Sequence, residues 1–368
     1  MSESIGPRMA PQTSHLVKVL LIGAGLAAMP LAANAAPHID KSVRTGSGLH
    51  EIVHDHQTDQ LFVTATGRKG EDDTSAVLQL DPESLKVTRR IATPARAFGL
   101  ALNNATDTLY TTNTGDRSVS VINAKTGKVM KTIRLENEQA PVMEGKQLTR
   151  PREAVVDEAH NRVYISGVSR DGMVWVLDGS SNKLMGNIEG IGDTPAGMAL
   201  DVDNQRLYVT LLESDAVVEI NLDNHSVVRR FEVDGNGPVS VALDRQRQRL
   251  LVANQGSGDM DVINLDSGQV MKRIDTGAGA LNVTLDSKDN RIYVANHGAG
   301  TVTVLDADDY DRLATLHIGL HPDGLTVDSK SHVAWVTSRG SGKEHRSDDA
   351  EHAREDGEQN DTVSRILP

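Results

Sequence analysis

Two adjacent positions that recur along the chain carry residues able to bind or transform a ligand. They lie five and four residues before a repeated Asp or Asn, where converging strands should favour small residues. The exceptions to that expectation are His50, Glu51, Phe98, Arg152, Glu153 and Asn282. Arg96 lies two residues before Phe98. An aromatic ring beside arginines can stack a base or a sugar and hold an anion.

The same residues allow two other interpretations. Arg152 could pair with Glu51 or Glu153 and simply fill the centre of the fold. A hydrolase would instead need a general base or a metal-bound water, and His50, Glu51 and Glu153 are the candidates that would converge. Composition and spacing leave these alternatives open.

A third recurring position, at the ends of the expected second strands, brings asparagines toward the same place. It holds Ala65, Asn113, Gly167, Leu211, Asn254, Asn296 and Ser338. Asn113, Asn254 and Asn296 could contact a ligand there. Alternatively, an Asn at a strand end hydrogen-bonds its own turn. His297 and Arg339 follow this position in two repeats and are further candidates.

The positions described above are defined by an internal sequence repeat, which also predicts where they lie in the fold. An Asp or Asn is followed seven residues later by a large, mostly aromatic side chain. The pairs are Asp55/Phe62, Asn103/Tyr110, Asp157/Tyr164, Asp201/Tyr208, Asp244/Leu251, Asp286/Tyr293 and Asp328/Trp335. Successive Asp or Asn anchors are 48, 54, 44, 43, 42 and 42 residues apart, and the long second interval indicates an insertion from Arg134 to Arg150. Such a period predicts stacked β units, and the aromatic column is expected to pack between them.

Each repeat resembles four short strands separated by turn residues. The repeat from Leu285 to Asp306 shows the pattern well. We therefore expect an all-β fold, a seven-bladed β-propeller with four-stranded antiparallel blades. The last repeat lacks a fourth strand after its third, Thr362 to Ile366, and Asp40 to Gly46 resembles the missing one. The N-terminal strand is thus predicted to close the last blade, which removes an open edge.

The first 35 residues have the features of a cleavable export signal. Arg8, His15 and Lys18 precede an apolar run from Val19 to Leu31, which is shorter than a spanning helix needs. Small residues at Ala33 to Ala35 suit cleavage after Ala35. We expect residues 36–368 to form the propeller, periplasmic, without membrane insertion after cleavage, and monomeric.

Composition excludes several kinds of chemistry. The 368 residues include no cysteine, so disulfides, thiolate metal sites and cysteine nucleophiles are excluded. A formal net charge of −13 is unfavourable for general phosphate binding. Residues 340–361, charged and small, predict a disordered acidic loop in the last blade. His50, His54 and His56 lack a recognised metal spacing, and we expect no metal, no cofactor and no catalytic residue.

The segment Tyr293-Val294-Ala295-Asn296 and its counterparts resemble the YVTN-type β-propeller repeat family. The resemblance covers nearly all of residues 36–368 and includes Val174 to Gly179 and Asp361 to Ile366. It implies a periplasmic, non-catalytic protein that can bind single-stranded DNA.

These observations favour a non-enzymatic protein that binds a ligand at the mouth of the propeller channel. Single-stranded DNA or another anionic ligand is the expected partner. One alternative is a propeller enzyme, either a lactonase or a quinone-dependent oxidoreductase. Another is a scaffold that meets a second protein of the cell envelope.

Overall fold

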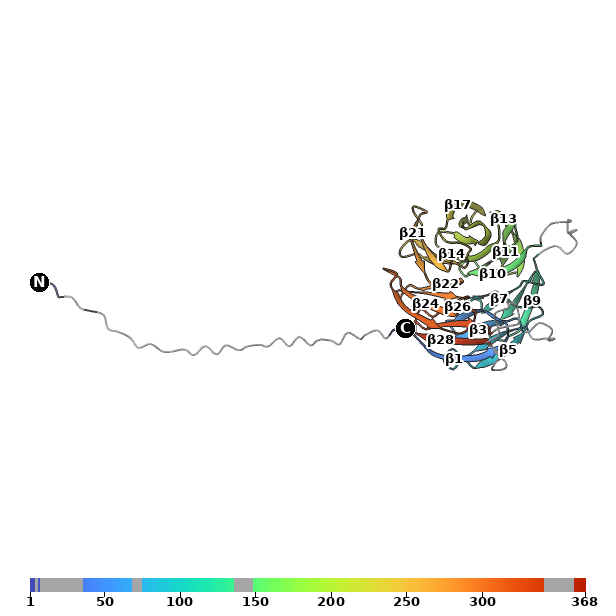
Figure 1. The fold of residues 1–368 in the computed structure, drawn as a ribbon, viewed down its shortest axis with the longest axis horizontal. Coiled ribbons are helices and arrows are strands. Elements are labelled where there is room, and N and C mark those ends of the chain that lie inside the picture. The colour runs from blue at the N-terminus through green and yellow to red at the C-terminus, as the bar shows by residue number, and fades with distance from the viewer. Residues whose placement is uncertain (4–5, 7–35, 68–74, 136–147, 341–360) are drawn as a thin grey trace, which may run out of the picture. The chain divides into compact units, whose positions relative to one another are not determined.

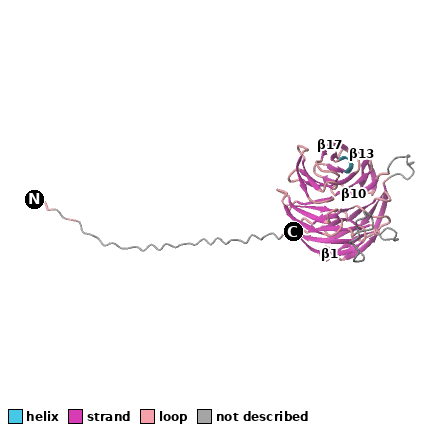
Figure 2. Cartoon of the chain, viewed as in Figure 1, coloured by secondary structure: helices cyan, strands magenta, loops and turns pink. Residues whose placement is uncertain are grey.

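The computed structural model describes residues 1–3, 6, 36–67, 75–135, 148–340 and 361–368. Residues from Ala36 to Pro368 form one compact unit. Its described part consists almost entirely of strands, together with the short 3-10 helix η1 (Leu212–Ser214) (Figure 2). None of the described helices is long and apolar enough to span a membrane. Most of the predicted signal peptide, the centre of the insertion and most of the acidic loop lie outside the described residues.

The described chain contains twenty-eight strands, and in each repeat they follow one another outward from the inner strand of a sheet. The inner strands are β2 (Leu49–Asp55), β6 (Leu100–Asn103), β10 (Arg150–Asp157), β14 (Pro195–Asp201), β18 (Pro238–Asp244), β22 (Ala280–Asp286) and β26 (Pro322–Val327). The second strands are β3 (Gln60–Ala65), β7 (Thr108–Asn113), β11 (Arg162–Val168), β15 (Arg206–Leu211), β19 (Arg249–Asn254), β23 (Arg291–Asn296) and β27 (Ala334–Ser338).

The remaining strands complete each sheet outward. The third strands are β4 (Ala76–Leu80), β8 (Ser118–Asn123), β12 (Gly172–Asp178), β16 (Ala216–Asn221), β20 (Asp259–Asn264), β24 (Thr301–Asp306) and β28 (Asp361–Leu367). The outer strands are β5 (Val87–Ala92), β9 (Val129–Arg134), β13 (Lys183–Gly192), β17 (Ser226–Glu232), β21 (Val270–Asp275), β25 (Arg312–His317) and β1 (His38–Gly46).

These strands form seven antiparallel four-stranded sheets. Each inner strand contacts the inner strands of the two neighbouring sheets, so the seven sheets close into a ring. The predicted seven-bladed β-propeller is confirmed. We call the end of its axis at which the inner strands begin the mouth. The ends of the second strands lie at the same end, because each pairs antiparallel with an inner strand.

The last blade closes as predicted. Its order is β1-β28-β27-β26, with the N-terminal strand outermost. Val43 pairs with Val363, and Ser42 Oγ lies 2.7 Å from Ser364 Oγ. Figure 1 shows β1 (blue) beside β28 (red) at the edge of the propeller.

The repeated Asp is a turn residue. Asp55 Oδ1, for example, accepts hydrogen bonds from the backbone N–H groups of Gln57 and Thr58 at 2.9 and 3.1 Å. Four residues after each anchor the backbone takes a positive φ, which Asn, Asp and related residues tolerate better than β-branched ones. These residues are Asp59, Asp107, Asn161, Gln205, Gln248, Asn290 and His332. The turn holds the two strands in register, and so fixes where each inner strand begins.

The aromatic column forms the seams between blades, as predicted. Its members are buried, none being more than 4% exposed: Phe62, Tyr110, Tyr164, Tyr208, Tyr293 and Trp335. They pack in clusters that join one sheet to the next. Trp335 also donates from Nε1 to the Pro82 carbonyl at 3.0 Å. The aromatic column is therefore structural, and the candidate ligand-binding residues are those at the mouth.

Candidate functional site

Threonine hydroxyls clamp the backbone on which the mouth residues stand. Thr337 Oγ1 donates to the carbonyl oxygen of His50, Thr64 Oγ1 to that of Phe98, and Thr112 Oγ1 to that of Arg152. Each of these bonds is 2.6 Å long and joins one blade to the next. A neighbouring blade thus fixes the backbone position of each of these three candidate residues.

Glycines make the close approach of the inner strands possible. A Cβ atom at Gly99 would lie 2.2 Å from the Arg152 carbonyl oxygen, and one at Gly324 would lie 2.4 Å from the His50 carbonyl oxygen. Both distances are far inside van der Waals contact, so only glycine fits. Glu51 follows Gly324 around the ring at the same strand position, and Gly99 follows Glu51. The glycines therefore flank the larger side chains.

A continuous row of side chains crosses four blades at the mouth. We call it the mouth row: Arg339, Asp323, His50, Phe98 and Arg152. Asp323 Oδ2 lies 3.1 Å from Arg339 Nε and accepts a hydrogen bond from His50 Nδ1 at 3.0 Å. The His50 ring lies 4.3 Å from the Phe98 ring between centroids, and the Arg152 guanidinium carbon lies 5.9 Å from the Phe98 centroid. The row places cationic and aromatic groups side by side.

Two glutamates, Glu51 on β2 and Glu153 on β10, stand next to this row; we call them the axial glutamates. Glu51 Oε1 accepts from its neighbour's N–H, that of Ile52, at 3.3 Å. Glu153 Oε1 accepts from the Met198 N–H of the next blade at 3.1 Å. Both residues are half-buried. Each carboxylate therefore has one oxygen anchored to the backbone.

The axial glutamates hold protons unusually well. Burial raises the pKa of Glu51 to about 8, and repulsion from Glu153 and Asp323 adds to it. Burial likewise raises the pKa of Glu153 to about 7, against the opposing effects of the Met198 N–H and Arg152. The two groups thus titrate around neutral pH rather than near the usual value for glutamate.

Asp323 has the opposite behaviour. Burial alone would raise its pKa, but the hydrogen bond and charge of His50, with the charge of Arg339, bring the pKa below its ordinary value. Asp323 is thus the fixed negative charge of the mouth row, and it orients both His50 and Arg339.

His297 and His321 extend the mouth row on the side of Arg339. His297 Nδ1 donates to the Pro322 carbonyl at 3.1 Å, and its Nε2 lies 3.4 Å from Arg339 Nη2. The two imidazole rings lie 4.7 Å apart. Burial lowers the pKa of His297, with Arg339 acting in the same direction. A neutral His297 that accepts from Arg339 fits both contacts.

The structure brings the predicted residues His50, Glu51, Phe98, Arg152 and Glu153 together. Arg96 lies exposed in the loop before β6, and Asn282 lies half-buried on β22. Neither has a hydrogen bond or ion pair to the mouth row.

The three asparagines lie at the mouth end of their strands, but they are buried inside the blades. Asn113, Asn254 and Asn296 are fully buried, and their amide groups donate to third-strand side chains of their own blades. Asn113 Nδ2, for instance, donates to Ser118 Oγ at 2.9 Å and Ser120 Oγ at 3.0 Å. Asn296 Nδ2 also donates to the carbonyl of Thr276, which follows the outer strand of the preceding blade, at 3.1 Å. Their observed role is to fasten the second strand to the third.

The sequence analysis missed Asp323, which links His50 to Arg339 in the mouth row. Asp323 was recognisable, because a charge at a position that elsewhere holds Ala196, Val239 or Leu281 breaks the repeat pattern. Arg339 and His297 received little weight, since nothing in one strand indicates which side chain of another blade it will meet. His321, in the loop before β26, gave no signal of its own.

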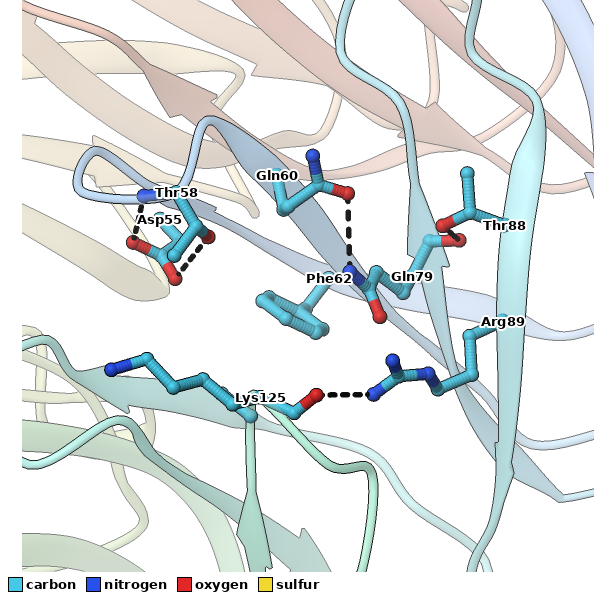
Figure 3. Close-up of a pocket in the computed structure, with 9 residues that line it drawn as sticks. Asp55, Thr58, Gln60, Phe62, Gln79, Thr88, Arg89 and Lys125 are labelled. Atoms are coloured by element: carbon cyan, nitrogen blue, oxygen red, sulfur yellow. Dashed lines mark hydrogen bonds between the residues drawn. The ribbon is translucent and has the colours of Figure 1, made fainter.

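A separate pocket of about 430 Å³ lies at the seam of the first two blades, with Asp55, Phe62, Gln79, Arg89 and Lys125 among its lining residues (Figure 3). Its polar groups bond mainly to one another, as when Arg89 Nη1 donates to the Lys125 carbonyl at 2.8 Å. Equivalent residues line a smaller pocket between the third and fourth blades. Such recurrence indicates a feature of propeller architecture, so we place the candidate site at the mouth.

Among the described residues, the side chains that converge closely enough to ligate a metal are Asp286, Asp289 and His332. They lie at the end of the inner strand away from the mouth. His332 Nδ1 donates to Asp286 Oδ2 at 2.7 Å, and Arg291 Nε lies 3.1 Å from Asp289 Oδ2. These contacts explain why the three residues lie together: the hydrogen bond between His332 and Asp286 joins blade seven to blade six. The absence of a metal stays a prediction.

The fold and the mouth together define a class of protein: a seven-bladed β-propeller with an ionisable cluster on its axis. A family model described as YncE-like β-propeller matches residues 59–355. The chain therefore belongs to the YncE-like β-propeller family, and the predicted relation to repeat propellers is confirmed.

Three relatives carry the name uncharacterized protein YncE. The one from Escherichia coli O157:H7 is 34% identical over 215 residues, which is 58% of this chain and 60% of the relative. The one from Escherichia coli strain K12 is 32% identical over 222 residues, 60% of this chain and 62% of the relative. The one from Salmonella typhi is 33% identical over 215 residues, 58% and 60% respectively. The chain thus spans about three fifths of the length of these relatives.

Proposed function

We propose that this chain is a non-enzymatic binding protein that holds an anionic ligand at the mouth, with single-stranded DNA as the first candidate. We further propose that residues 1–35 direct its export to the periplasm. The observation that carries the binding proposal is that the Arg152 guanidinium forms no ion pair or hydrogen bond with another described residue, although it lies near the Phe98 ring.

Two further arginines support this proposal. Arg96 and Arg150 are exposed at the same end of the propeller, and neither forms an ion pair or hydrogen bond with another described residue. A local group of free cations can bind phosphates even when the protein as a whole is negative. The resemblance to the YVTN-type repeat family, which implies binding of single-stranded DNA, supports the choice of ligand. The bases of such a ligand could contact the Phe98 and His50 rings.

The test is fluorescence anisotropy with a labelled oligothymidylate. Arg152→Ala and Phe98→Ala should each weaken binding by roughly tenfold, as loss of one cation or one stacking ring would. Arg230→Ala is the matched control, because it removes an equal charge from an outer strand, where Arg230 pairs with Glu232. Affinity should fall steeply with salt. Unchanged binding in both mouth variants, also on glycan and peptide arrays, would refute a ligand site at the mouth.

A second candidate function has one specific observation in its favour. Two carboxyl groups with pKa values of about 8 and 7 stand beside a His–Asp pair, and such near-neutral groups suit general acid–base catalysis. A propeller lactonase or other hydrolase would use them. Turnover of a lactone panel that is lost in Glu153→Gln would favour this function over simple binding.

A further inference from the structure

Both axial glutamates lie close enough to Arg152, the cation that the proposed function uses, to feel its charge. Glu153 is the next residue after Arg152 on β10, and Glu51 occupies the equivalent position on β2. Arg152 interacts electrostatically with both. The second carboxyl oxygen of each glutamate, Oε2, accepts no hydrogen bond from a described residue. At the mouth, two carboxyl groups thus each have one oxygen hydrogen-bonded to the described protein and one oxygen that is not.

The charge on these groups decides whether an anion is attracted. With both glutamates ionised, two negative charges act against the single positive charge of Arg152 on any arriving anion. Coulomb interactions over a few ångströms are worth several times thermal energy where water is restricted. With both protonated, the glutamates no longer oppose the charge of Arg152, and the negative charge of Asp323 is balanced by Arg339. A carboxyl O–H can also itself donate to an anion.

We infer that an anion bound at Arg152 is taken up together with protons on Glu51 and Glu153, so that the mouth binds anions more tightly as pH falls from about 9 to about 7. This inference rests on the proposed function and adds a regulatory property to the same site. Burial already favours the neutral forms of both glutamates in the free protein, and repulsion from Glu153 and Asp323 adds to this at Glu51. A bound anion would favour the neutral forms further.

Other titratable or charged groups face the pair from the elements packed around it. They are Arg152 on β10, His50 on β2, Asp323 on β26, Arg339 after β27, His297 after β23 and His321 before β26. The inner strands of blades two, four, five and six offer Gly99, Gly197, Ser240 and Asn282 at the glutamate position, none of which titrates.

The experiment measures oligothymidylate affinity at fixed ionic strength between pH 6 and pH 9. A phosphodiester does not titrate in this interval, so a change in affinity comes from the protein. Between pH 7 and pH 9 we expect affinity to fall by roughly tenfold, the factor that corresponds to one pKa unit of linkage. Calorimetry in two buffers of different ionisation enthalpy should show proton uptake on binding at pH 8.

The double variant Glu51→Gln/Glu153→Gln tests the assignment, because Gln imitates the neutral carboxyl group in shape. Its affinity should stay high and nearly constant from pH 7 to pH 9, without proton uptake. The variant His321→Gln serves as the control and should keep the fall in affinity above pH 7.5. Thermal melts at each pH would show that all variants are folded.

The outcomes separate this inference from the proposed function. If the wild-type chain binds oligothymidylate with an affinity independent of pH, or if the double variant keeps the wild-type pH dependence, the proton linkage is wrong while the binding site stands. If the wild-type chain binds none at any pH, the proposed function fails and the linkage fails with it.

Discussion

Asp323 and Glu51 are two acidic residues at the same end of the propeller axis, on neighbouring blades, and their protonation behaviour is opposite. Asp323 receives a hydrogen bond from His50 and an ion pair from Arg339, and its pKa lies below the ordinary value. Glu51 receives one N–H from Ile52, and burial with nearby negative charge raises its pKa to about 8.

The contrast shows that burial alone does not decide the charge of a carboxyl group in this fold. Burial opposes ionisation of both residues. What differs is the number of cationic partners: Asp323 has His50 from the next blade and Arg339 from its own, whereas no cationic group among the described residues hydrogen-bonds to Glu51. The ring arrangement thus places a permanent negative charge beside a group whose charge depends on pH.

The largest effect is expected when the donors of Asp323 lose their acceptor. Asp323→Asn should lower the free energy of unfolding at pH 7 by about 2 to 3 kcal/mol, because His50 and Arg339 are left without their carboxylate. The folded-state pKa is depressed, so this stabilisation is present above the unfolded pKa of about 3.9 and is lost as pH falls below it. Urea denaturation at pH 7 and at pH 3 checks both statements.

Asp59→Asn is the control for that experiment, since Asp59 also pairs with a histidine but its side chain is 77% exposed. It should change stability by less than about 1 kcal/mol. If Asp323→Asn and Asp59→Asn lower the free energy of unfolding equally, the contacts of Asp323 with His50 and Arg339 stabilise the fold no more than an exposed pair does.

A smaller effect of opposite sign is expected at Glu51. The unfolded chain loses the proton near pH 4.5, whereas the folded chain keeps it up to about pH 8. Wild-type stability should therefore decline as pH rises across this interval, relative to Glu51→Gln. The variant should be more stable at pH 8.5, on the order of 1 to 2 kcal/mol after allowance for partial water access, and equal at pH 4. Guanidinium denaturation at both pH values measures this, and Glu232→Gln, on an outer strand, should show no such trend.

The smallest effect concerns the coupling between the axial glutamates. Repulsion from Glu153 contributes to the raised pKa of Glu51, so Glu153→Gln should lower that pKa by less than about one unit. Carbon-13 NMR of the Glu51 carboxyl carbon across pH 5 to 9 would detect the shift. Asp323→Asn should move it in the same direction, and a Glu51 pKa that responds to neither variant would contradict the repulsion.

The fold could be predicted from the sequence because its signals are repeated. Asp at a turn and an aromatic side chain at a seam recur at fixed spacing, so a weak signal in one repeat is supported by six others. The closure by residues 40–46 followed from the same comparison, and the structure extends that strand to His38–Gly46.

The site was harder to predict, because its contacts join different repeats. His50, Phe98 and Arg152 were identified because they break a column, but the link from His50 to Asp323 depends on side chains of two blades. The asparagines illustrate a second limit of single-strand reasoning. Thr112 and Asn113 are neighbours in β7, so their side chains point to opposite faces of the sheet. Thr112 clamps Arg152, and Asn113 turns to Ser118 and Ser120.

The shared last blade also sets the order in which the molecule can be completed. Ser42 and Ser364 touch across the β1–β28 ladder although 322 positions separate them in the chain. Contacts this distant carry a large loop-closure cost and form slowly unless the intervening structure already brings them together. The six blades made of consecutive strands can assemble one after another, whereas the seventh acts as a latch that engages only when both ends of the propeller are available.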